Sequence, residues 1–437
     1  MPTTPANGTE QGRADPDVLV IGAGIVGLFC AYFLRQAGAT VTVVERGPVA
    51  GPQSCSYGNT GFVGTQGSVP LAEPGAAAQM LRGLLDPAGP VSVRPRWDAE
   101  LARWLWHFSR ACNEQDARAS YGVLLDMKKR SLEILRELCA AGSLAGSFTA
   151  NGLLVACRTP QGFDRACAAV PGAVAAGVPL RILDRPALRA LEPDADFDVC
   201  GAVYNEEGAG LHVPGFLTEF ARMLAGTGVH ICADTDVVGF EVAGGAIRKV
   251  RTTGGDFAPA ETVIAAGAWS GECARKLDIR LLLQPARGYS ITVKAPQGSP
   301  RRPVLLSEGK VALMPFGDRL RIAGTLELSG LNGAPSRRRP NAMMATVGAF
   351  LPRLDCTETI QTWSGLRPCT PDGLPFLGRA RPYSNLSVAC GHSHIGMGLA
   401  PASGRLIAQV LTGEQPDMDL APLRIERYRP AAVRTRA

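Results

Sequence analysis

Near its start the chain reads Val18-Leu19-Val20-Ile21, followed directly by Gly22-Ala23-Gly24-Ile25-Val26-Gly27. The four apolar residues suit a parallel strand that is buried on both faces. The glycines follow the pattern G-x-G-x-x-G, in which Gly22 permits a tight turn, Gly24 lets the backbone approach a pyrophosphate, and Gly27 lets a helix pack on the strand. The stretch therefore predicts a strand, a turn and a helix that together bind a dinucleotide.

The residues that follow complete a βαβ unit. We expect a helix from about Ile25 to Gln36, with Gly38 as its stop, and a second strand over Thr40 to Val44. Glu45 comes at about the spacing of roughly 20 residues at which an acid binds the ribose hydroxyls of the adenosine. Its carboxylate would repel a 2′-phosphate, which argues against NADP, although the neighbouring Arg46 weakens that argument.

Length and composition indicate a globular protein of two packed domains. The chain has 437 residues, of which 46% are apolar and 19% are charged, so it can bury a large core and lacks the signature of disorder. The formal net charge of +6 is mild and the basic residues are scattered, so nucleic acid is not an expected partner. The basic runs leave attraction to an anionic membrane surface open.

The sequence carries no sign of export or of a membrane span. The first sixteen residues have no apolar core and no basic start, so we expect a frayed tail rather than a signal peptide. Val18 to Leu34 is apolar, but its glycines divide it into strand, turn and helix. The twelve cysteines form no C-x-x-C pair and no metal-like spacing with the five histidines. We therefore expect reduced thiols, no metal site and a cytoplasmic protein, with a peripheral position at the inner membrane as the alternative.

Three later tracts are specific to one family of proteins. They are Ser54-Cys55-Ser56-Tyr57-Gly58-Asn59-Thr60-Gly61, then Val69-Pro70-Leu71-Ala72-Glu73-Pro74-Gly75, and Leu84-Leu85-Asp86-Pro87 leading into Trp104-Leu105-Trp106-His107-Phe108. On these tracts the chain from Asp17 to Tyr428 resembles the D-amino acid oxidase superfamily of flavoproteins, and within it the D-amino acid dehydrogenase branch. The resemblance implies that the dinucleotide is FAD, bound without a covalent bond, although Cys369 keeps the question of covalent attachment open.

The resemblance also implies the architecture. The expected fold class is α/β, with a Rossmann-type FAD-binding domain and a discontinuous, mixed-sheet α+β substrate domain, as in the glutathione-reductase-like fold. The strand-rich residues 281 to 360 suit the sheet of the substrate domain. The expected segments are 17–89, 205–280 and 361–430 for the FAD-binding domain, 90–204 and 281–360 for the substrate domain, and 1–16 and 431–437 for the two tails.

The family's FAD contacts map onto several stretches of this sequence. The first are the glycine turn from Gly22 to Gly27 and the pair Glu45 and Arg46. The strand at Val238 matches the family's adenine-side strand, whose backbone meets the base. The remaining expected contacts are Ser56, Asn59, Ala266, Gly267, Trp269, Gly391, His392, Gly396, Met397 and Gly398.

Arg367 is the residue that the resemblance assigns to the substrate. It lies in Gly365-Leu366-Arg367-Pro368, followed by Thr370-Pro371-Asp372-Gly373, and these motifs lie at the flavin in the family. In amino-acid-oxidising relatives this arginine clamps the substrate carboxylate, and its planar fork suits the task because it donates two charge-assisted hydrogen bonds. The alternative is a structural salt bridge. Asp372 is expected to brace the loop rather than to act as a base.

Two further side chains are candidates for contact with the amine or side chain of the substrate. They are Tyr289, for which packing within the sheet is the alternative, and His394, for which the alternative is a satisfied loop histidine. A helix is predicted over Pro401 to Leu411, with proline near its first turn and Gly413 as its stop. Its N-terminus would face the flavin and stabilise the anionic pyrimidine edge of the reduced ring.

The implied reaction is hydride transfer from the substrate Cα to flavin N5, which gives an imino acid that water hydrolyses to a keto acid. The expected substrate is a small amino acid, either a D-amino acid or a cyclic imino acid such as hydroxyproline. The segment Gly391 to Gly398 and the residues after it resemble glycine oxidase and hydroxyproline dehydrogenase more closely, so the substrate stays open. The electron acceptor is a quinone, a carrier or oxygen. Two alternatives are an oxygen-using amine oxidase of the glycine or sarcosine type and a flavoprotein subunit of a larger complex.

Overall fold

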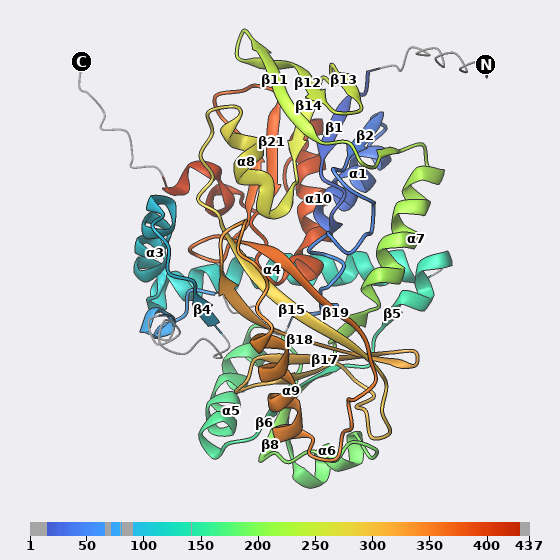
Figure 1. Ribbon diagram of the computed structural model, residues 1–437, viewed down its shortest axis with the longest axis vertical. Coiled ribbons are helices and arrows are strands. Elements are labelled where there is room, and N and C mark those ends of the chain that lie inside the picture. The colour runs from blue at the N-terminus through green and yellow to red at the C-terminus, as the bar shows by residue number, and fades with distance from the viewer. Residues whose placement is uncertain (1–14, 66–70, 79, 81–90, 141, 429–437) are drawn as a thin grey trace, which may run out of the picture.

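A computed structural model describes residues 15–65, 71–78, 80, 91–140 and 142–428. Of the two expected tails, only residues 15 and 16 are described. Residues 69, 70 and 84–87 of the family-specific tracts also lie outside the described residues. The molecule is elongated, with one large sheet in its upper half and a second, longer one crossing its lower half (Figure 1).

The upper sheet has six strands in the order β10-β2-β1-β14-β21-β20, and only β20 runs antiparallel to its neighbour. Val18 and Val20 of β1 pack against helices on one face, whereas Leu19 and Ile21 pack on the other face against a three-stranded meander. A strand with both faces covered needs apolar residues at every position, which is what the sequence shows. The strands are β1 (Val18–Ile21), β2 (Val41–Val44), β10 (His230–Cys232), β14 (Glu261–Ile264), β20 (Phe376–Arg379) and β21 (Leu386–Cys390).

Helices α1, α7 and α10 cover the first face, and α4 packs against α10 from outside. The bounds are α1 (Ile25–Gln36), α4 (Glu114–Cys139), α7 (Val213–Gly226) and α10 (Gly396–Thr412). The opposite face carries α8 (Ser270–Arg275) and the meander β11 (Val237–Ala243), β12 (Ala246–Thr252) and β13 (Gly255–Phe257). The predicted βαβ unit is thus confirmed, and α1 has the bounds that the sequence predicts.

The lower sheet has nine strands in the order β19-β15-β18-β17-β16-β6-β8-β7, with β4 paired to β18. It is mixed, because β4 and β6 run parallel to their neighbours β18 and β16 while the other pairs are antiparallel. The strands are β4 (Val91–Val93), β6 (Leu153–Cys157), β7 (Leu180–Asp184), β8 (Gly201–Asn205), β15 (Gln284–Lys294), β16 (Val304–Leu306), β17 (Val311–Phe316), β18 (Arg319–Leu328) and β19 (Thr359–Cys369). Helix α9 (Arg338–Phe350) packs on one face of this sheet (Figure 1).

Further helices and a small sheet complete the fold. The helices are α3 (Ala99–Ala111), α5 (Pro160–Ala175) and α6 (Arg185–Leu191), and the small sheet consists of β3 (Phe62–Val63), β9 (Ala209–Leu211) and β5 (Phe148–Thr149). Helices α5 and α6 join β6 to β7 and β7 to β8 within the lower sheet. The fold class predicted from the sequence is therefore confirmed. The division into domain segments stays a proposal, and β19 lies in the lower sheet although most of its residues fall in the last proposed FAD-binding segment.

Helix α10 differs from its prediction, because it begins at Gly396 rather than at Pro401. Proline inside a helix costs about 3 kcal/mol, so a local rule places it in the first turn. Here tertiary packing outweighs that cost, since nearly every residue from Met397 to Ala408 is buried. A Cβ added at Gly404 would lie 2.4 Å from the backbone of Phe29, so α1 and α10 touch directly. The predicted stop is confirmed, because Gly413 has a φ of 78°.

Candidate active site

A cleft opens where the carboxyl ends of β1, β2 and β14 meet the first turns of α1 and α10. Two of the three glycines in the turn after β1 are required by backbone contacts, because an added Cβ would lie 2.6 Å from Ala265 O at Gly22 and 1.9 Å from Gly22 O at Gly27. Gly24 differs, since its Cβ would meet only Ser56 Oγ, at 3.6 Å. That space beside the backbone is where a ligand can approach the turn.

Glu45 holds the glycine turn in place. Its Oε2 accepts a hydrogen bond of 2.8 Å from the N–H of Ala23, while burial raises the pKa of its carboxyl. The neighbouring Arg46 lies over the ring of Trp269, with Cζ 3.5 Å from the ring centroid. The side chains of Glu45, Arg46 and Trp269 line the cleft together with Gly267. Gly267 has a φ of 53°, and no atom lies within 4 Å of a Cβ added there.

Most residues expected to contact FAD line this one cleft. Those that do are Gly22, Gly24, Ile25, Val26, Glu45, Arg46, Ser56, Asn59, Ala266, Gly267, Trp269, His392, Gly396 and Met397. Those that do not are Gly27, Val238, Gly391 and Gly398. Gly27 serves helix packing, and Val238 points to solvent with 55% of its surface exposed while its neighbour Val237 lines the cleft.

Several lining residues were missed by the sequence reasoning. They include Gln53, Ser54, Cys55, Thr235, Asp236, Lys276, Pro368 and Ser393. Ser54, Cys55, Pro368 and Ser393 are neighbours of residues that were named, so their position in the motifs was the available signal. Thr235, Asp236 and Lys276 belong to no motif, and only the arrangement of the strands brings them to the cleft.

The loop Ser54 to Gly61 is clamped between the cleft and the lower sheet. Ser56 Oγ accepts from the N–H of Ile25 at 3.1 Å, at the start of α1. Arg321, buried in β18, donates to the carbonyls of Tyr57 and Asn59 at 2.9 and 3.0 Å. Burial lowers the pKa of Arg321 to about 10, and this buried cation makes no ion pair within the described part of the chain. The lower sheet therefore positions this loop, which lines one side of the cleft.

Arg367 is not itself among the residues that line the cleft, but it lies beside two that are, Cys55 and Pro368. Its Nη1 donates to the carbonyl of Thr325 at 2.7 Å. Burial lowers the pKa of its guanidinium, and the titratable groups beside it are the neutral thiols of Cys55 and Cys369 rather than a carboxylate. Among the residues that the structure describes, Arg367 forms no ion pair, so the alternative of a structural salt bridge has no partner there.

His394 lies close to Arg367 and stays neutral. Its side chain is exposed, and desolvation by the surrounding protein together with the positive charges of Arg367, Lys128 and Lys310 lowers its pKa. Its Nδ1 lies 3.2 Å from Ser393 Oγ, and its carbonyl accepts from Asn59 Nδ2 at 3.2 Å. A neutral imidazole near neutral pH can accept as well as donate a hydrogen bond.

His392 is also neutral, because burial lowers its pKa to about 3. Its Nε2 lies 2.9 Å from the hydroxyl of Ser403, which donates its own hydrogen to the carbonyl of Leu399 at 2.8 Å. The hydroxyl hydrogen is thus already used, so Nε2 carries the ring proton and Nδ1 is left as an acceptor.

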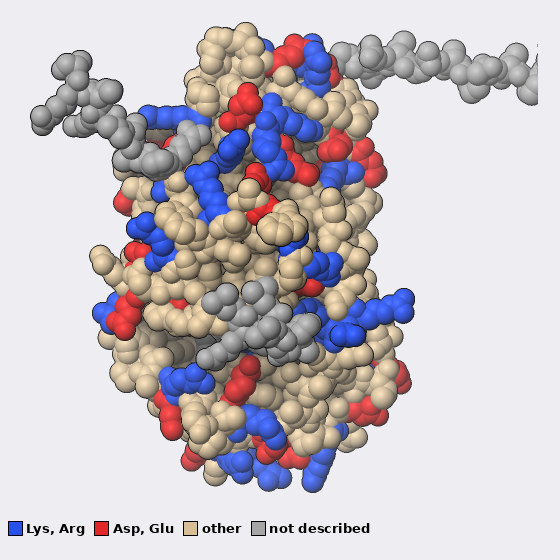
Figure 2. All heavy atoms as spheres, turned by 60° about the vertical axis from the view of Figure 1, so that its left-hand side comes forward, with Lys and Arg blue, Asp and Glu red and all other residues tan. Residues whose placement is uncertain are grey.

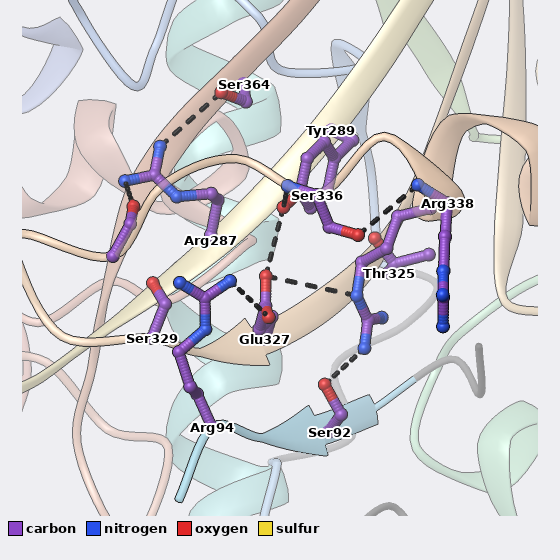
Figure 3. Close-up of polar contacts among 12 residues, drawn as sticks. Ser92, Arg94, Arg287, Tyr289, Thr325, Glu327, Ser329, Ser336, Arg338 and Ser364 are labelled. Atoms are coloured by element: carbon purple, nitrogen blue, oxygen red, sulfur yellow. Dashed lines mark hydrogen bonds and ion pairs between the residues drawn. The ribbon is translucent and has the colours of Figure 1, made fainter. Parts of the chain in front are cut away.

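Tyr289 lies away from Arg367. Side chains alternate between the two faces of a strand, and Gly288 is on the face that carries Arg367, so Tyr289 is on the other. Its side chain is 1% exposed, and its hydroxyl donates to Glu327 at 3.0 Å and accepts from the N–H of Ser336 at 2.8 Å (Figure 3). These contacts favour packing within the sheet over contact with a substrate.

Asp372 braces its loop, as predicted. Its two oxygens accept from Arg427 Nε and Nη2 at 2.7 and 3.0 Å, and Oδ1 also accepts from the N–H of Leu374 at 3.0 Å. Cys369 on the same motif is fully buried, with Sγ 3.4 Å from Ser393 Oγ. None of the twelve cysteines, all of which lie within the described residues, forms a disulfide.

The cleft fits FAD. It combines the glycine turn, the acid at Glu45, the open backbone at Gly24 and Gly267, and the start of α10. These features define an FAD-binding oxidoreductase. The model of the family described as FAD dependent oxidoreductase matches residues 17–410, and the chain belongs to that family. FAD is therefore its cofactor, and the protein is an enzyme.

Individual relatives agree with this. The D-amino acid dehydrogenase of Agrobacterium fabrum is 32% identical over 422 residues, which cover 94% of this chain and 99% of that protein. The D-amino acid dehydrogenase of Cereibacter sphaeroides is 33% identical over 422 residues, covering 94% and 95%. Glycine oxidase from Geobacillus kaustophilus superposes with a TM-score of 0.76 at 22% identity, covering 94% of this chain and 99% of that one, which shows a shared fold.

Proposed function

We propose that the protein oxidises the bond between Cα and nitrogen of a small amino acid, and that the substrate is a D-amino acid or a cyclic imino acid. FAD supplies the two-electron acceptor that takes hydride from Cα. The observation that carries the proposal is Arg367, a partly buried cation beside the lining residues Cys55 and Pro368, with no carboxylate partner among the described residues. A buried charge is costly when it is not compensated, so a substrate carboxylate is the natural counter-ion. The names of the relatives support the D-configuration.

Each side chain then has a distinct task. Arg367 binds and orients the carboxylate through the N–H groups that Thr325 does not use. Neutral His394 accepts a hydrogen bond from the substrate amine and does not protonate it. The first turn of α10, at Gly396 and Met397, presents its positive end to the cleft and stabilises negative charge there. We also propose that FAD is held without a covalent bond.

The test is an anaerobic titration of the purified protein, scanning the flavin absorbance bands during addition of D-amino acids, L-amino acids, glycine, sarcosine and hydroxyproline isomers. We expect bleaching by D-amino acids or by a cyclic imino acid, and full release of the flavin when the protein is precipitated with acid. Loss of the bands with glycine or sarcosine alone, and peroxide formation when air is readmitted, would identify an amine oxidase instead. A flavin that no amino acid bleaches would remove the proposed role of Arg367.

We further propose that electrons leave toward a membrane-bound acceptor and that the protein binds the membrane peripherally through the face that carries α3. Trp97, just before this helix, is fully exposed, and Trp106 within it is 53% exposed, with Arg110 over its ring at 5.0 Å. Lys and Arg side chains gather in the upper half of the same face (Figure 2). Exposed tryptophan beside basic residues suits an anionic lipid interface. No helix in the described ranges is both long and apolar enough to cross a membrane.

Sedimentation with lipid vesicles tests this surface. The protein is expected to sediment with phosphatidylglycerol vesicles more than with phosphatidylcholine vesicles, because the basic face attracts anionic lipid, and salt should weaken the binding. A Trp97→Ala/Trp106→Ala variant should lose most of the binding, whereas Val242→Ala, which removes an exposed apolar side chain elsewhere, should not. Equal sedimentation of the tryptophan variant and the wild type would show that this face is not the one that binds.

A further inference from the structure

Arg367 reaches across its own sheet. On β19 it lies opposite Ala286 of β15, and beyond β15 lies β18, whose Thr325 carbonyl accepts the hydrogen bond from Arg367 Nη1. The guanidinium therefore passes over the backbone of β15 before it reaches its acceptor. A side chain that crosses a strand in this way needs a gap in the row of side chains on that face.

Gly288 of β15 is that gap. A Cβ added there would lie 2.3 Å from Cζ, 2.5 Å from Nη2 and 2.7 Å from Nε of Arg367. These distances are far below van der Waals contact, so any side chain at this position would displace the guanidinium. Gly288 is not among the glycines with positive φ, so the space above it, rather than its backbone conformation, requires glycine.

A β-bulge supplies the acceptor. The pairing of β15 with β18 shifts between Arg287↔Glu327 and Tyr289↔Gly324, so that Thr325 and Leu326 both lie opposite Gly288. Thr325 has a φ of 57°, a strained conformation for a β-branched residue, and no partner among the described residues satisfies its buried hydroxyl. Bulges next to active sites re-aim backbone and side-chain groups, and here the bulge directs a carbonyl at Arg367.

We propose that Gly288 and the bulge at Thr325 are positioning elements that fix the orientation of Arg367. Anchoring one N–H group on the Thr325 carbonyl leaves the other N–H groups of the fork directed at the substrate carboxylate. This inference rests on the proposed function of Arg367 and adds the two elements that prepare it. Preorganisation of this kind increases affinity because less conformational freedom is lost on binding.

The test uses the FAD-loaded protein and propionate, a carboxylate without an amine, with binding followed as a shift of the flavin absorbance bands. Gly288→Ala is expected to raise the dissociation constant of propionate by on the order of tenfold to a hundredfold, because charge-assisted hydrogen bonds are lost. Binding of propionamide, which has no charge, should stay the same. Gly348→Ala on α9 is the control, since nothing lies within 4 Å of an added Cβ there.

Arg367→Ala separates the two hypotheses. If it leaves propionate binding unchanged, the proposed function of Arg367 fails. If it abolishes binding while Gly288→Ala retains the wild-type affinity, only the positioning role is overturned.

A double variant guards against simple misfolding. Adding Gly288→Ala to Arg367→Ala should lower neither the melting temperature nor the propionate affinity further, because the methyl group then meets no guanidinium. An equal fall in melting temperature in both backgrounds would mean that the fold itself requires Gly288, and the proposal would be abandoned.

Discussion

An Arg367→Ala variant is expected to oxidise its amino acid substrate with kcat/KM lower than wild type by on the order of 10² to 10³. The guanidinium has no carboxylate partner among the described residues, so its charge is available to the substrate carboxylate. Removing it takes away two charge-assisted hydrogen bonds and leaves the substrate carboxylate buried without a counter-ion. Steady-state kinetics with a D-amino acid and an artificial electron acceptor measure this.

Two companion variants define the cause. Arg367→Lys keeps a charge but not the planar fork, so its kcat/KM should lie between those of wild type and Arg367→Ala. Arg367→Met removes a partly buried charge that has no ion pair among the described residues and keeps the volume, so its free energy of unfolding should equal or exceed that of the wild type. A large loss of both activity and stability in Arg367→Met would instead point to a structural role for the arginine.

Replacing Glu327 by alanine is expected to lower the free energy of unfolding by about 3 to 5 kcal/mol, the usual effect of breaking a buried ion pair from one side. Glu327 is the acidic member of the cluster in Figure 3. Its carboxylate accepts from Arg94 Nη2 at 3.1 Å and from the Tyr289 hydroxyl at 3.0 Å, and it lies 4.0 Å from Nε of Arg339, which is 1% exposed. Without Glu327, Arg94 and Arg339 both lose this carboxylate, and the Tyr289 hydroxyl loses its acceptor.

Chemical denaturation of the variant and the wild type measures this difference. Glu114→Ala is the matched control, because the ion pair of Glu114 with Arg118 has side chains that are 73% and 82% exposed. Exposed pairs of this kind contribute about 0 to 1 kcal/mol, so the control should unfold almost as the wild type does. Equal stabilities of the two variants would show that the contacts of Glu327 do not stabilise the fold.

Local sequence rules succeeded where the structure is itself local. The βαβ unit from Val18 to Val44 depends on apolar runs and on glycines that lie a few residues apart, so strand, turn and helix were predictable, and α1 has the expected bounds. Glu45 directly follows the second strand of this unit, and its carboxylate accepts a hydrogen bond from the N–H of Ala23 in the glycine turn. The resemblance carried by the later tracts extended this to FAD and to Arg367.

Strand geometry decided what the motifs could not. Tyr289 lies one residue from Gly288, and the two-residue period of a strand turns the tyrosine to the face away from Arg367. Val238 was named for the backbone of a strand that does reach the cleft; its side chain points to solvent, and its neighbour Val237 lines the cleft. The face of a strand depends on register and on the layer packed against it, and a motif encodes neither.

By itself, the sequence determined the dinucleotide-binding unit, because that unit depends on residues that are neighbours along the chain. The family resemblance of its motifs predicted the fold class, and it assigned to Arg367 the substrate role that we propose. Only the tertiary structure decided that Arg321 clamps the loop from Ser54 to Gly61, that Glu327 balances Arg94 and Arg339, and that Gly288 makes room for Arg367. Each of these contacts joins strands or loops that are distant in sequence. They exist only because the packing of the two sheets brings those segments together.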